Sequence, residues 1–214
     1  MADQHSAEAF QQLKLTKIHL SPRLLENCSR HIAEQFDSLW APAEKLARHL
    51  HRLPTSLVRF LTRTPRGHMV ITPGAPNYEP GVQLLRGREL EAVAFVSLTD
   101  LVEDPLHTLH VVGHLLDHLL GCRGAPTGRW LSDGHGVNPS WAEIGQQIPA
   151  LYELGYAVDN IAMAGPRQYF ARSVAWYIYD RCQLNVADPQ IERLLRQTVF
   201  DEAFCRRTLS PGLK

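Results

Sequence analysis

Residues 104–121 read DPLHTLHVVGHLLDHLLG, and this stretch carries the strongest structural signal in the chain. Asp104 can cap a helix whose first position is Pro105, and Gly121 suits a C-terminal stop. Four histidines lie within twelve residues of one another: His107, His110, His114 and His118. Because an α-helix turns by about 100° per residue, all four fall on a stripe about 80° wide. The stretch therefore predicts one helix with a histidine face and an apolar face.

Histidines four residues apart on one helical face can both bind a single zinc ion. Two such pairs overlap here, His110 with His114 and His114 with His118. His110 and His118 are two turns apart, roughly 12 Å, so a straight helix cannot bring all three onto one ion. A neutral, hydrogen-bonded polar edge of an amphipathic helix explains the same stripe, and both interpretations remain open.

Hydrolysis at a zinc ion also needs a base that takes a proton from water. In the motif H-E-x-x-H this base is the glutamate after the first histidine, but here Val111 occupies that position. In the inverted order, the segment HLLDH offers Asp117 instead, with a side chain one methylene shorter than glutamate. Asp117 is therefore a secondary catalytic candidate, and a structural hydrogen bond is its alternative role.

The segments around the histidine helix indicate an α+β fold that is predominantly helical. GHMVITPG (67–74) and EAVAFVSL (91–98) are short apolar, β-branched runs typical of strands. The turn-rich connection 75–90 has room for a further strand. Residues 1–14 are expected to be a polar N-terminal tail, and 15–214 a single domain. Its N-terminal part, 15–66, is predicted to be helical, and 67–214 to hold the sheet and further helices.

Local signals place the remaining helices. Ser21 can cap a helix that continues to Phe36 with apolar residues at helical spacing. Further helices are predicted up to His49, before Pro65, around Pro149, from Pro166 onwards and from Pro189 to the end of the chain. The segment 122–140, rich in Gly, Pro, Ser and Asp, is predicted to be a long loop, and loops of this length are often functional.

Composition excludes several partners and compartments. The 22 basic and 22 acidic side chains balance, so we expect no nucleic-acid partner and no polybasic membrane contact. No segment approaches the roughly 20 apolar residues of a membrane span, and the start of the chain lacks the apolar region of a secretory signal. The four cysteines are scattered and are expected to be free thiols. These features predict a cytoplasmic protein.

Two segments resemble one family. HVVGHLLDHLLG resembles the H-E-x-G-H-x-x-D-x-x-x-G helix of zincin (gluzincin) metallopeptidases of the anthrax lethal-factor-like and MtfA-like types. The matching residues are His110, Gly113, His114, Asp117 and Gly121. PRQYFARSVAWYIYD, followed by the segment from Pro189 to Phe200, resembles their second signature, which supplies the third zinc ligand. The resemblance covers about residues 93–200 and implies a zincin-like domain, with a small sheet beside the histidine-bearing helix.

The departures from the family pattern fall on its chemistry. The general-base glutamate is replaced by Val111, and the third-ligand glutamate falls on Gln168. The next glutamate of the family helix falls on Arg172. The tyrosine that stabilises the transition state is missing, and Tyr156 is the nearest substitute. A neutral amide oxygen is a poorer zinc ligand than a carboxylate. The resemblance therefore implies a scaffold that has lost its reaction.

Other side chains could rebuild a site. Asp133 and His135 lie on the long loop, although Asp beside Gly is also an ordinary turn pair. Glu143 and Glu153 follow on the connecting helix, and Trp130 and Trp141 flank the loop. The metal-ligand candidates are His110 and His114, then Gln168, His118 and His135. The cofactor is accordingly either zinc or none.

Three functional hypotheses follow. In the first, the chain is a non-catalytic pseudo-metallopeptidase that binds a protein or peptide in the former active-site cleft. In the second, it is an active zinc-dependent hydrolase whose base has moved to Asp117, Asp133 or a glutamate of the connecting helix. In the third, it is a helical partner protein with incidental histidines. A structure without a small sheet beside the histidine helix would favour the third hypothesis.

Overall fold

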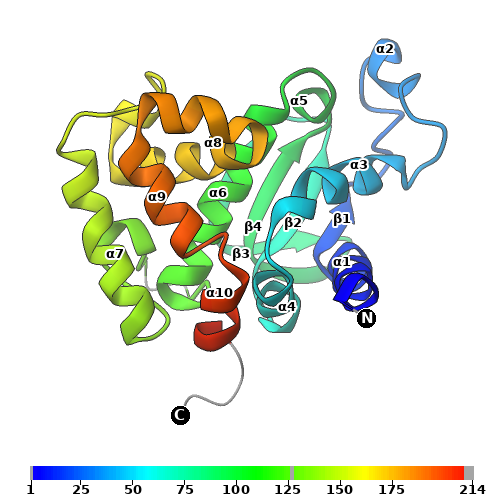
Figure 1. Cartoon of the computed structure of the whole chain (residues 1–214). Coiled ribbons are helices and arrows are strands. Elements are labelled where there is room, and N and C mark those ends of the chain that lie inside the picture. Colours follow the sequence, from blue (N-terminus) through cyan, green and yellow to red (C-terminus); the bar gives the residue numbers. More distant parts are fainter. Residues whose placement is uncertain (1, 126–127, 210–214) are drawn as a thin grey trace.

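The computed structural model describes residues 2–125 and 128–209, and the side chains from position 5 onwards within these ranges. The chain forms an α+β fold in which helices predominate around one small mixed sheet (Figure 1). Helices α7 (Pro139–Tyr152), α8 (Pro166–Ala187) and α9 (Pro189–Gln197) lie on one side of the histidine helix α6 (Pro105–Cys122). The sheet lies on its other side, so the predicted fold class is confirmed at this level.

The sheet has four strands in the order β1-β2-β4-β3. Their bounds are β1 (Ile18–Leu20), β2 (His68–Thr72), β3 (Asn77–Leu85) and β4 (Arg88–Ser97). β1 and β4 both run parallel to β2, whereas β3 runs antiparallel to β4. His19 lies opposite Val70, and Val70 lies opposite Phe95, which fixes the parallel register. β1 and β3 are thus the outer strands, and α6 packs against β4 and β3.

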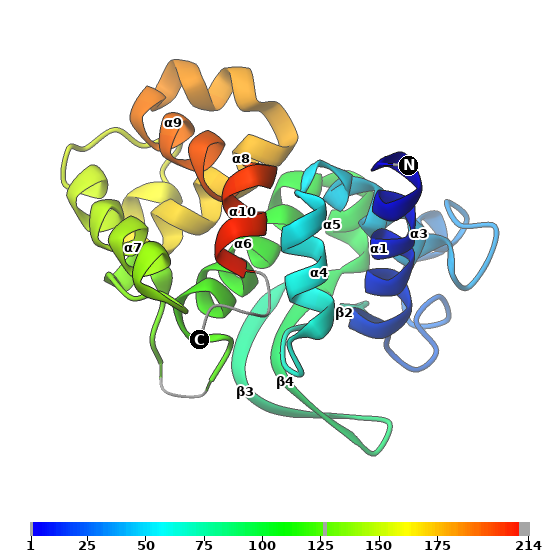
Figure 2. The ribbon, with the colours of Figure 1, turned by 60° about the horizontal axis from the view of Figure 1, so that its bottom comes forward.

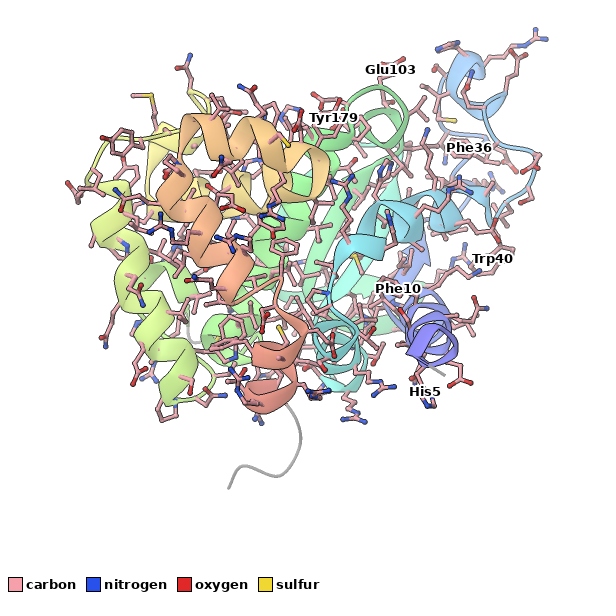
Figure 3. All side chains as sticks on the ribbon, in the orientation of Figure 1. His5, Phe10, Phe36, Trp40, Glu103 and Tyr179 are labelled. Carbon is pink, nitrogen blue, oxygen red and sulfur yellow. The ribbon has the colours of Figure 1, made fainter. Side chains whose placement is uncertain are left out.

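The other helices surround this centre. On the sheet side they are α1 (Ala2–Lys17), α2 (Arg30–Ala33), α3 (Ala41–His49), the 3-10 turn η1 (Leu50–Arg52), α4 (Thr55–Arg63) and α5 (Leu98–Glu103). After α6 they are η2 (Leu131–Asp133), η3 (Ala162–Ala164) and α10 (Glu202–Leu209). Side chains fill the space between the sheet and the helices (Figure 3). Among the described residues, no helix combines the length and apolarity of a membrane span.

Helix α6 begins where the sequence predicts. The Asp104 side chain accepts a hydrogen bond from the His107 N–H, and Pro105 is the first helical residue. The predicted stop at Gly121 is wrong, because the helix continues to Cys122 and is capped by Arg123, which has a left-handed φ of 58°. Gly121 instead allows close packing: a Cβ there would lie 2.5 Å from the backbone of Trp130 and Leu131.

Helix α8 crosses α6 at very short range. A Cβ on Gly113 would lie 2.3 Å from the carbonyl oxygen of Ala171. Only glycine at this position lets the two backbones approach so closely. The contact fixes the position of the first turns of α8 against the middle of α6, and with it the side chain of Gln168.

Several expectations for the N-terminal part are wrong. Residues 1–14 are not a polar tail as far as they are described, because α1 spans Ala2–Lys17 and buries Ala9 and Leu13. The predicted helix from Ser21 to Phe36 is reduced to α2, since Arg23 adopts a left-handed φ of 51°.

Two other expectations agree with the structure. The further strand that the sequence allowed between residues 75 and 90 is present as β3. The four cysteines are free, as expected.

Candidate functional site

The histidine pair faces Gln168 across the contact between α6 and α8. The ring centroids of His110 and His114 are 4.8 Å apart, as expected for one helical turn. Gln168 stands in the first turn of α8, and its Oε1 lies 3.2 Å from His114 Nε2. His110 is 9% exposed, and its Nε2 is buried with no hydrogen-bond partner in the described residues. The three side chains that the resemblance predicts as ligand positions therefore lie together.

Both imidazoles of the pair are held in the neutral form. Burial lowers the pKa of His110 to about 3, the neighbouring His114 and Arg172 act in the same direction, and the nearby Gln168 amide opposes them. Burial also lowers the pKa of His114, with a smaller contribution from Arg167 and an opposing hydrogen bond from Gln168. At neutral pH the pair therefore offers ring-nitrogen lone pairs and N–H groups but carries no charge.

The residue that follows His110 cannot act as a general base. Val111 is 6% exposed and belongs to the main hydrophobic core. A valine side chain neither accepts nor donates a proton, so no base occupies the place that H-E-x-x-H reserves for one.

Both carboxyl oxygens of Asp117 form hydrogen bonds with the long loop. Its Oδ1 accepts a hydrogen bond of 2.8 Å from the Ser132 N–H, and its Oδ2 lies 2.6 Å from the Ser132 Oγ. The carboxyl is fully buried, and burial raises its pKa to about 7. Asp117 therefore ties the loop to α6 in a structural role, which is the alternative that the sequence left open.

The other two carboxylates in this region are neutralised by arginines. Asp133 pairs with Arg167 at 2.5 Å, and this guanidinium also lies 4.7 Å above the Trp130 ring. Asp159 accepts a hydrogen bond of 2.6 Å from Arg172. Burial acts to raise its pKa, but the hydrogen bonds from Trp176, Arg172 and the Ala162 N–H, together with the Arg172 charge, outweigh burial and lower the pKa. Arg172, at the position where the resemblance predicts a glutamate, therefore brings its own counter-ion.

His118 is held away from the pair by two hydrogen bonds. Its Nε2 lies 2.9 Å from the Ala125 carbonyl oxygen, which only accepts, so Nε2 donates. Nδ1 is then the acceptor for the Tyr78 hydroxyl at 2.6 Å. Trp130 stacks on the His118 ring at 4.8 Å. With both nitrogens engaged, His118 has no free lone pair for a metal ion.

The remaining candidates lie outside this cluster. His107 is half-buried next to Asp104 at the helix start. His135, Tyr156, Glu143 and Glu153 are all exposed. Within the described ranges, none of them makes a hydrogen bond or a ring contact with His110 or His114. Residues 126 and 127 of the predicted long loop lie outside the described residues.

Sequence reasoning missed two neighbours of the site. Tyr78 comes from β3, and its ring stacks near His114 at 6.4 Å and meets Trp130 edge-on at 5.5 Å. Arg167 precedes Gln168 directly, and its pairing with Asp133 closes the loop over the cluster. No local pattern marks either residue, because both contacts join segments far apart in the sequence.

A catalytic zinc ion does not fit this donor set. His110, His114 and Gln168 supply only neutral ligands, and Arg167 and Arg172 place positive charge nearby. Within residues 2–125 and 128–209, no three His, Cys, Asp or Glu side chains are grouped to hold a metal ion. A divalent cation is held best where a carboxylate or thiolate contributes negative charge.

No protein-family model matches the chain, and neither a curated protein nor a solved structure matches it. The geometry of the described residues is therefore the basis for assigning a function.

Proposed function

We propose that the chain is a metallopeptidase-related protein whose catalytic site has degraded, and that it binds a protein or peptide segment at the former site. The observation that carries the proposal is that, in the part of the chain that the structure describes, no carboxylate near the histidine pair is free of another partner. Asp117 is bound by Ser132, Asp133 by Arg167 and Asp159 by Arg172. Hydrolysis by a positioned water needs both a base and an electrostatic partner for the developing charge, and these groups are committed elsewhere.

Strand β3 supports a peptide as the bound partner. It is an outer strand that, among the described residues, pairs with β4 alone, so its other edge keeps backbone groups without a strand partner there. Tyr78 of β3 packs against His114, which places that end of the strand beside the histidine pair. An extended peptide that added to this edge would pass the pair, with backbone hydrogen bonds contributing affinity.

A second candidate is an active zinc-dependent hydrolase with a displaced base, and one observation favours it. The buried Nε2 of His110 has no partner among the described residues, and a buried polar atom without a partner costs about 1–3 kcal/mol. A metal ion or a ligand group that binds at this nitrogen would remove that cost. A structural partner protein without any site is disfavoured, because the sheet does lie beside the histidine helix.

Metal content and hydrolysis distinguish the two candidates. The protein is purified without chelator, its zinc content is measured, and a library of unstructured peptides is incubated with it in the presence of added zinc. We expect less than one zinc ion per chain and no cleavage beyond that of a His110→Ala variant. Stoichiometric zinc together with cleavage that His110→Ala abolishes would overturn the pseudoenzyme proposal and establish the hydrolase.

A further inference from the structure

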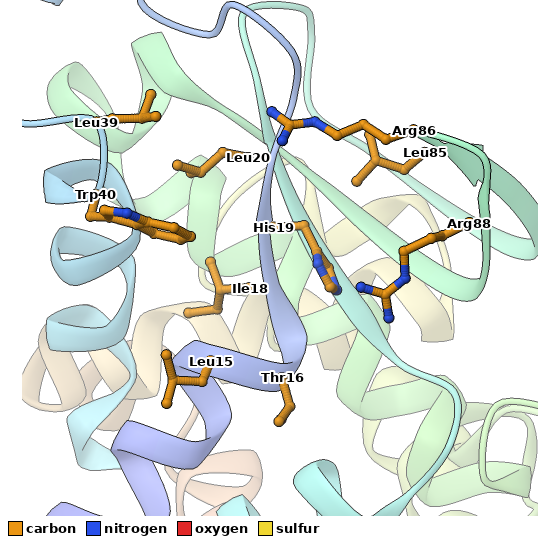
Figure 4. A pocket seen from close by; sticks show the side chains of 10 residues that line it. All are labelled: Leu15, Thr16, Ile18, His19, Leu20, Leu39, Trp40, Leu85, Arg86 and Arg88. Atoms are coloured by element: carbon orange, nitrogen blue, oxygen red, sulfur yellow. The ribbon is translucent and has the colours of Figure 1, made fainter.

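A separate cavity of about 440 Å3 lies along the free edge of β1, which is the outer strand at the other end of the sheet order from β3, and the tip of the β3–β4 hairpin also lines it. Ile18, His19 and Leu20 all line it, although the side chains of Ile18 and Leu20 are buried. Successive side chains of a strand point to opposite faces, so three consecutive residues border one cavity only along the edge. The cavity is therefore a groove beside the outer strand (Figure 4).

The backbone of β1 is open toward this groove. The Ser21 N–H donates to the Ile71 carbonyl of β2 at 2.9 Å. Because alternate residues of a strand face the same neighbour, His19 also faces β2, and the N–H and C=O of Leu20 face the groove. A strand lying in the groove can use these groups.

The two sides of the groove differ in chemistry. On one side are Leu15, Leu39 and Trp40, which are 68%, 53% and 57% exposed. Trp40 lies at the margin of the molecule (Figure 3). On the other side are His19 and two arginines, Arg86 and Arg88, and Figure 4 shows the Arg88 guanidinium near the His19 ring. Apolar large side chains gathered at one exposed place commonly mark an interaction site.

The positive side has no counter-ion. The lining residues include no Asp or Glu. Over the described ranges, neither Arg86 nor Arg88 is ion-paired. The His19 environment agrees: burial, Arg88 and Lys17 lower its pKa, in that order. An acidic partner would therefore be attracted to this side of the groove.

Arg86 occupies a backbone position that suits another residue type. The β3–β4 hairpin sweeps from the side of α6 to the side of α1 (Figure 2), and its two-residue turn is Arg86–Gly87. Their φ angles are 50° and 77°, the pattern of a turn that favours Asn-Gly. An arginine kept in a left-handed conformation that asparagine would adopt more easily is consistent with a binding role for its side chain.

We propose that this groove binds an extended acidic segment of a partner protein, which adds to β1 as a fifth strand. Alternate side chains of the segment are apolar, facing Trp40 and Leu39, and acidic, facing Arg86 and Arg88. A second copy of this chain fits less well. Pairing of two β1 edges about a two-fold axis would bring the same arginines toward each other without acidic partners. This site is independent of the histidine pair and of the function proposed there.

Fluorescence anisotropy tests the proposal with labelled hexapeptides and the full chain. The probe is acetyl-Glu-Leu-Glu-Val-Glu-Leu-amide, and its control carries Lys in place of each Glu. We expect the acidic peptide to bind and the lysine peptide not to bind. The acidic affinity should fall as salt is raised, because exposed charges are screened. Equal binding of both peptides, or no binding of the acidic one, would overturn the proposal.

Protein variants locate the binding. Arg86→Asn should weaken acidic-peptide binding by about tenfold, while its turn remains at least as favourable, so a folding defect cannot explain the loss. Trp40→Ala should weaken binding through the apolar side. Arg193→Asn, which removes the same charge from an exposed arginine on α9, is the matched control and should leave the affinity unchanged. Unchanged affinity of both Arg86→Asn and Trp40→Ala would contradict the proposed groove.

Two further measurements test whether the peptide binds by strand addition and whether a second copy of the chain binds in the groove instead. Acidic peptides N-methylated at odd or at even positions lose opposite sets of backbone donors, so strand addition requires that one isomer bind much more weakly than the other. Equal affinity of the two isomers would rule out strand addition. Sedimentation of the chain alone should show a monomer at the concentrations used, and a dimer that Trp40→Ala dissociates would assign the groove to a second copy instead.

Discussion

The Nε2 of His114 and the Oε1 of Gln168 lie 3.2 Å apart, across two helices whose residues are 54 positions apart in sequence. The contact depends on Gly113, one residue before His114, which lets α8 approach α6. An amide at this place holds the imidazole by a hydrogen bond, whereas a carboxylate would add a negative charge. We therefore expect the identity of residue 168 to determine whether the histidine pair can hold a divalent cation.

Gln168→Glu is expected to raise zinc affinity. The carboxylate would stand beside two neutral imidazoles and add the charge that the native donor set lacks. We expect the dissociation constant for zinc to fall by at least about tenfold, equivalent to about 1.4 kcal/mol. Isothermal titration with zinc measures the change. Gln12→Glu adds the same charge on the exposed face of α1 and should leave zinc affinity as it is. No gain from Gln168→Glu would refute the ligand geometry inferred for this contact.

His110→Phe is expected to make the free energy of unfolding less dependent on pH below pH 6.5. The folded pKa of His110 is about 3, below the unfolded value of 6.5, so the unfolded chain binds more protons between these pH values. The stability contributed by the neutral ring is present above pH 6.5 and is lost as pH falls toward 3. Phenylalanine removes this loss, on the order of 2–3 kcal/mol between pH 6.5 and pH 4.

Urea unfolding of the His110→Phe variant from pH 4 to pH 8 measures that effect. At neutral pH the variant should be as stable as the native chain or about 1 kcal/mol more stable, since the unpartnered Nε2 is gone. His135→Gln changes an exposed histidine and serves as the control. Parallel pH profiles for the native chain and His110→Phe would show that His110 is not buried as described.

Asp117→Asn is expected to remove a loss of stability that the native chain shows as pH rises toward neutrality. The folded pKa of Asp117 is about 7, above the ordinary carboxyl value of 3.8, so the folded chain holds a proton that the unfolded chain has lost. Native stability therefore falls as pH rises from about 4 through 7. Asparagine keeps the side-chain shape and can still pair with Ser132, but it does not ionise.

Between pH 5 and pH 8, the free energy of unfolding of Asp117→Asn should improve relative to the native chain by on the order of 2 kcal/mol. Thermal and urea unfolding at both pH values give this difference. Asp37→Asn, at an exposed position, should show no such change. A difference of the opposite sign would mean that the ionised carboxylate is favoured by its bonds to Ser132.

Local sequence signals were sufficient to predict the central helix α6. The start of α6 follows from Asp104 and Pro105 because an N-cap and a first-turn proline act on adjacent residues. The end could not be read in the same way, since Gly121 serves a contact with Trp130 instead of a cap. α1 was missed because only isolated positions such as Ala9 and Leu13 are buried in an otherwise polar segment.

The site was predictable only in part. His110, His114 and Gln168 were singled out from the sequence, but the occupation of Asp117 and Asp133 by Ser132 and Arg167 depends on how the long loop folds back. Tyr78 was not predicted, because its bond to His118 spans 40 residues and joins a strand to a helix. Contacts of this kind depend on the packing of the whole chain and produce no periodic pattern of residue types in the sequence.

Gly113→Ala is expected to destabilise the fold, and it tests the relationship between α6 and α8 directly. Alanine has the better helix propensity by about 1 kcal/mol, so propensity alone predicts stabilisation. The added Cβ would, however, meet the Ala171 carbonyl oxygen at 2.3 Å, and two helix backbones must then separate. Overpacking of this kind costs about 1–3 kcal/mol, so we expect a net loss in urea unfolding. Gly81→Ala, in strand β3, where the new Cβ meets nothing within 4 Å, is the control for an added methyl group without a clash and should change stability less. If Gly113→Ala were as stable as the native chain, the close crossing that positions Gln168 beside His114 would be wrong, and the proposed site with it.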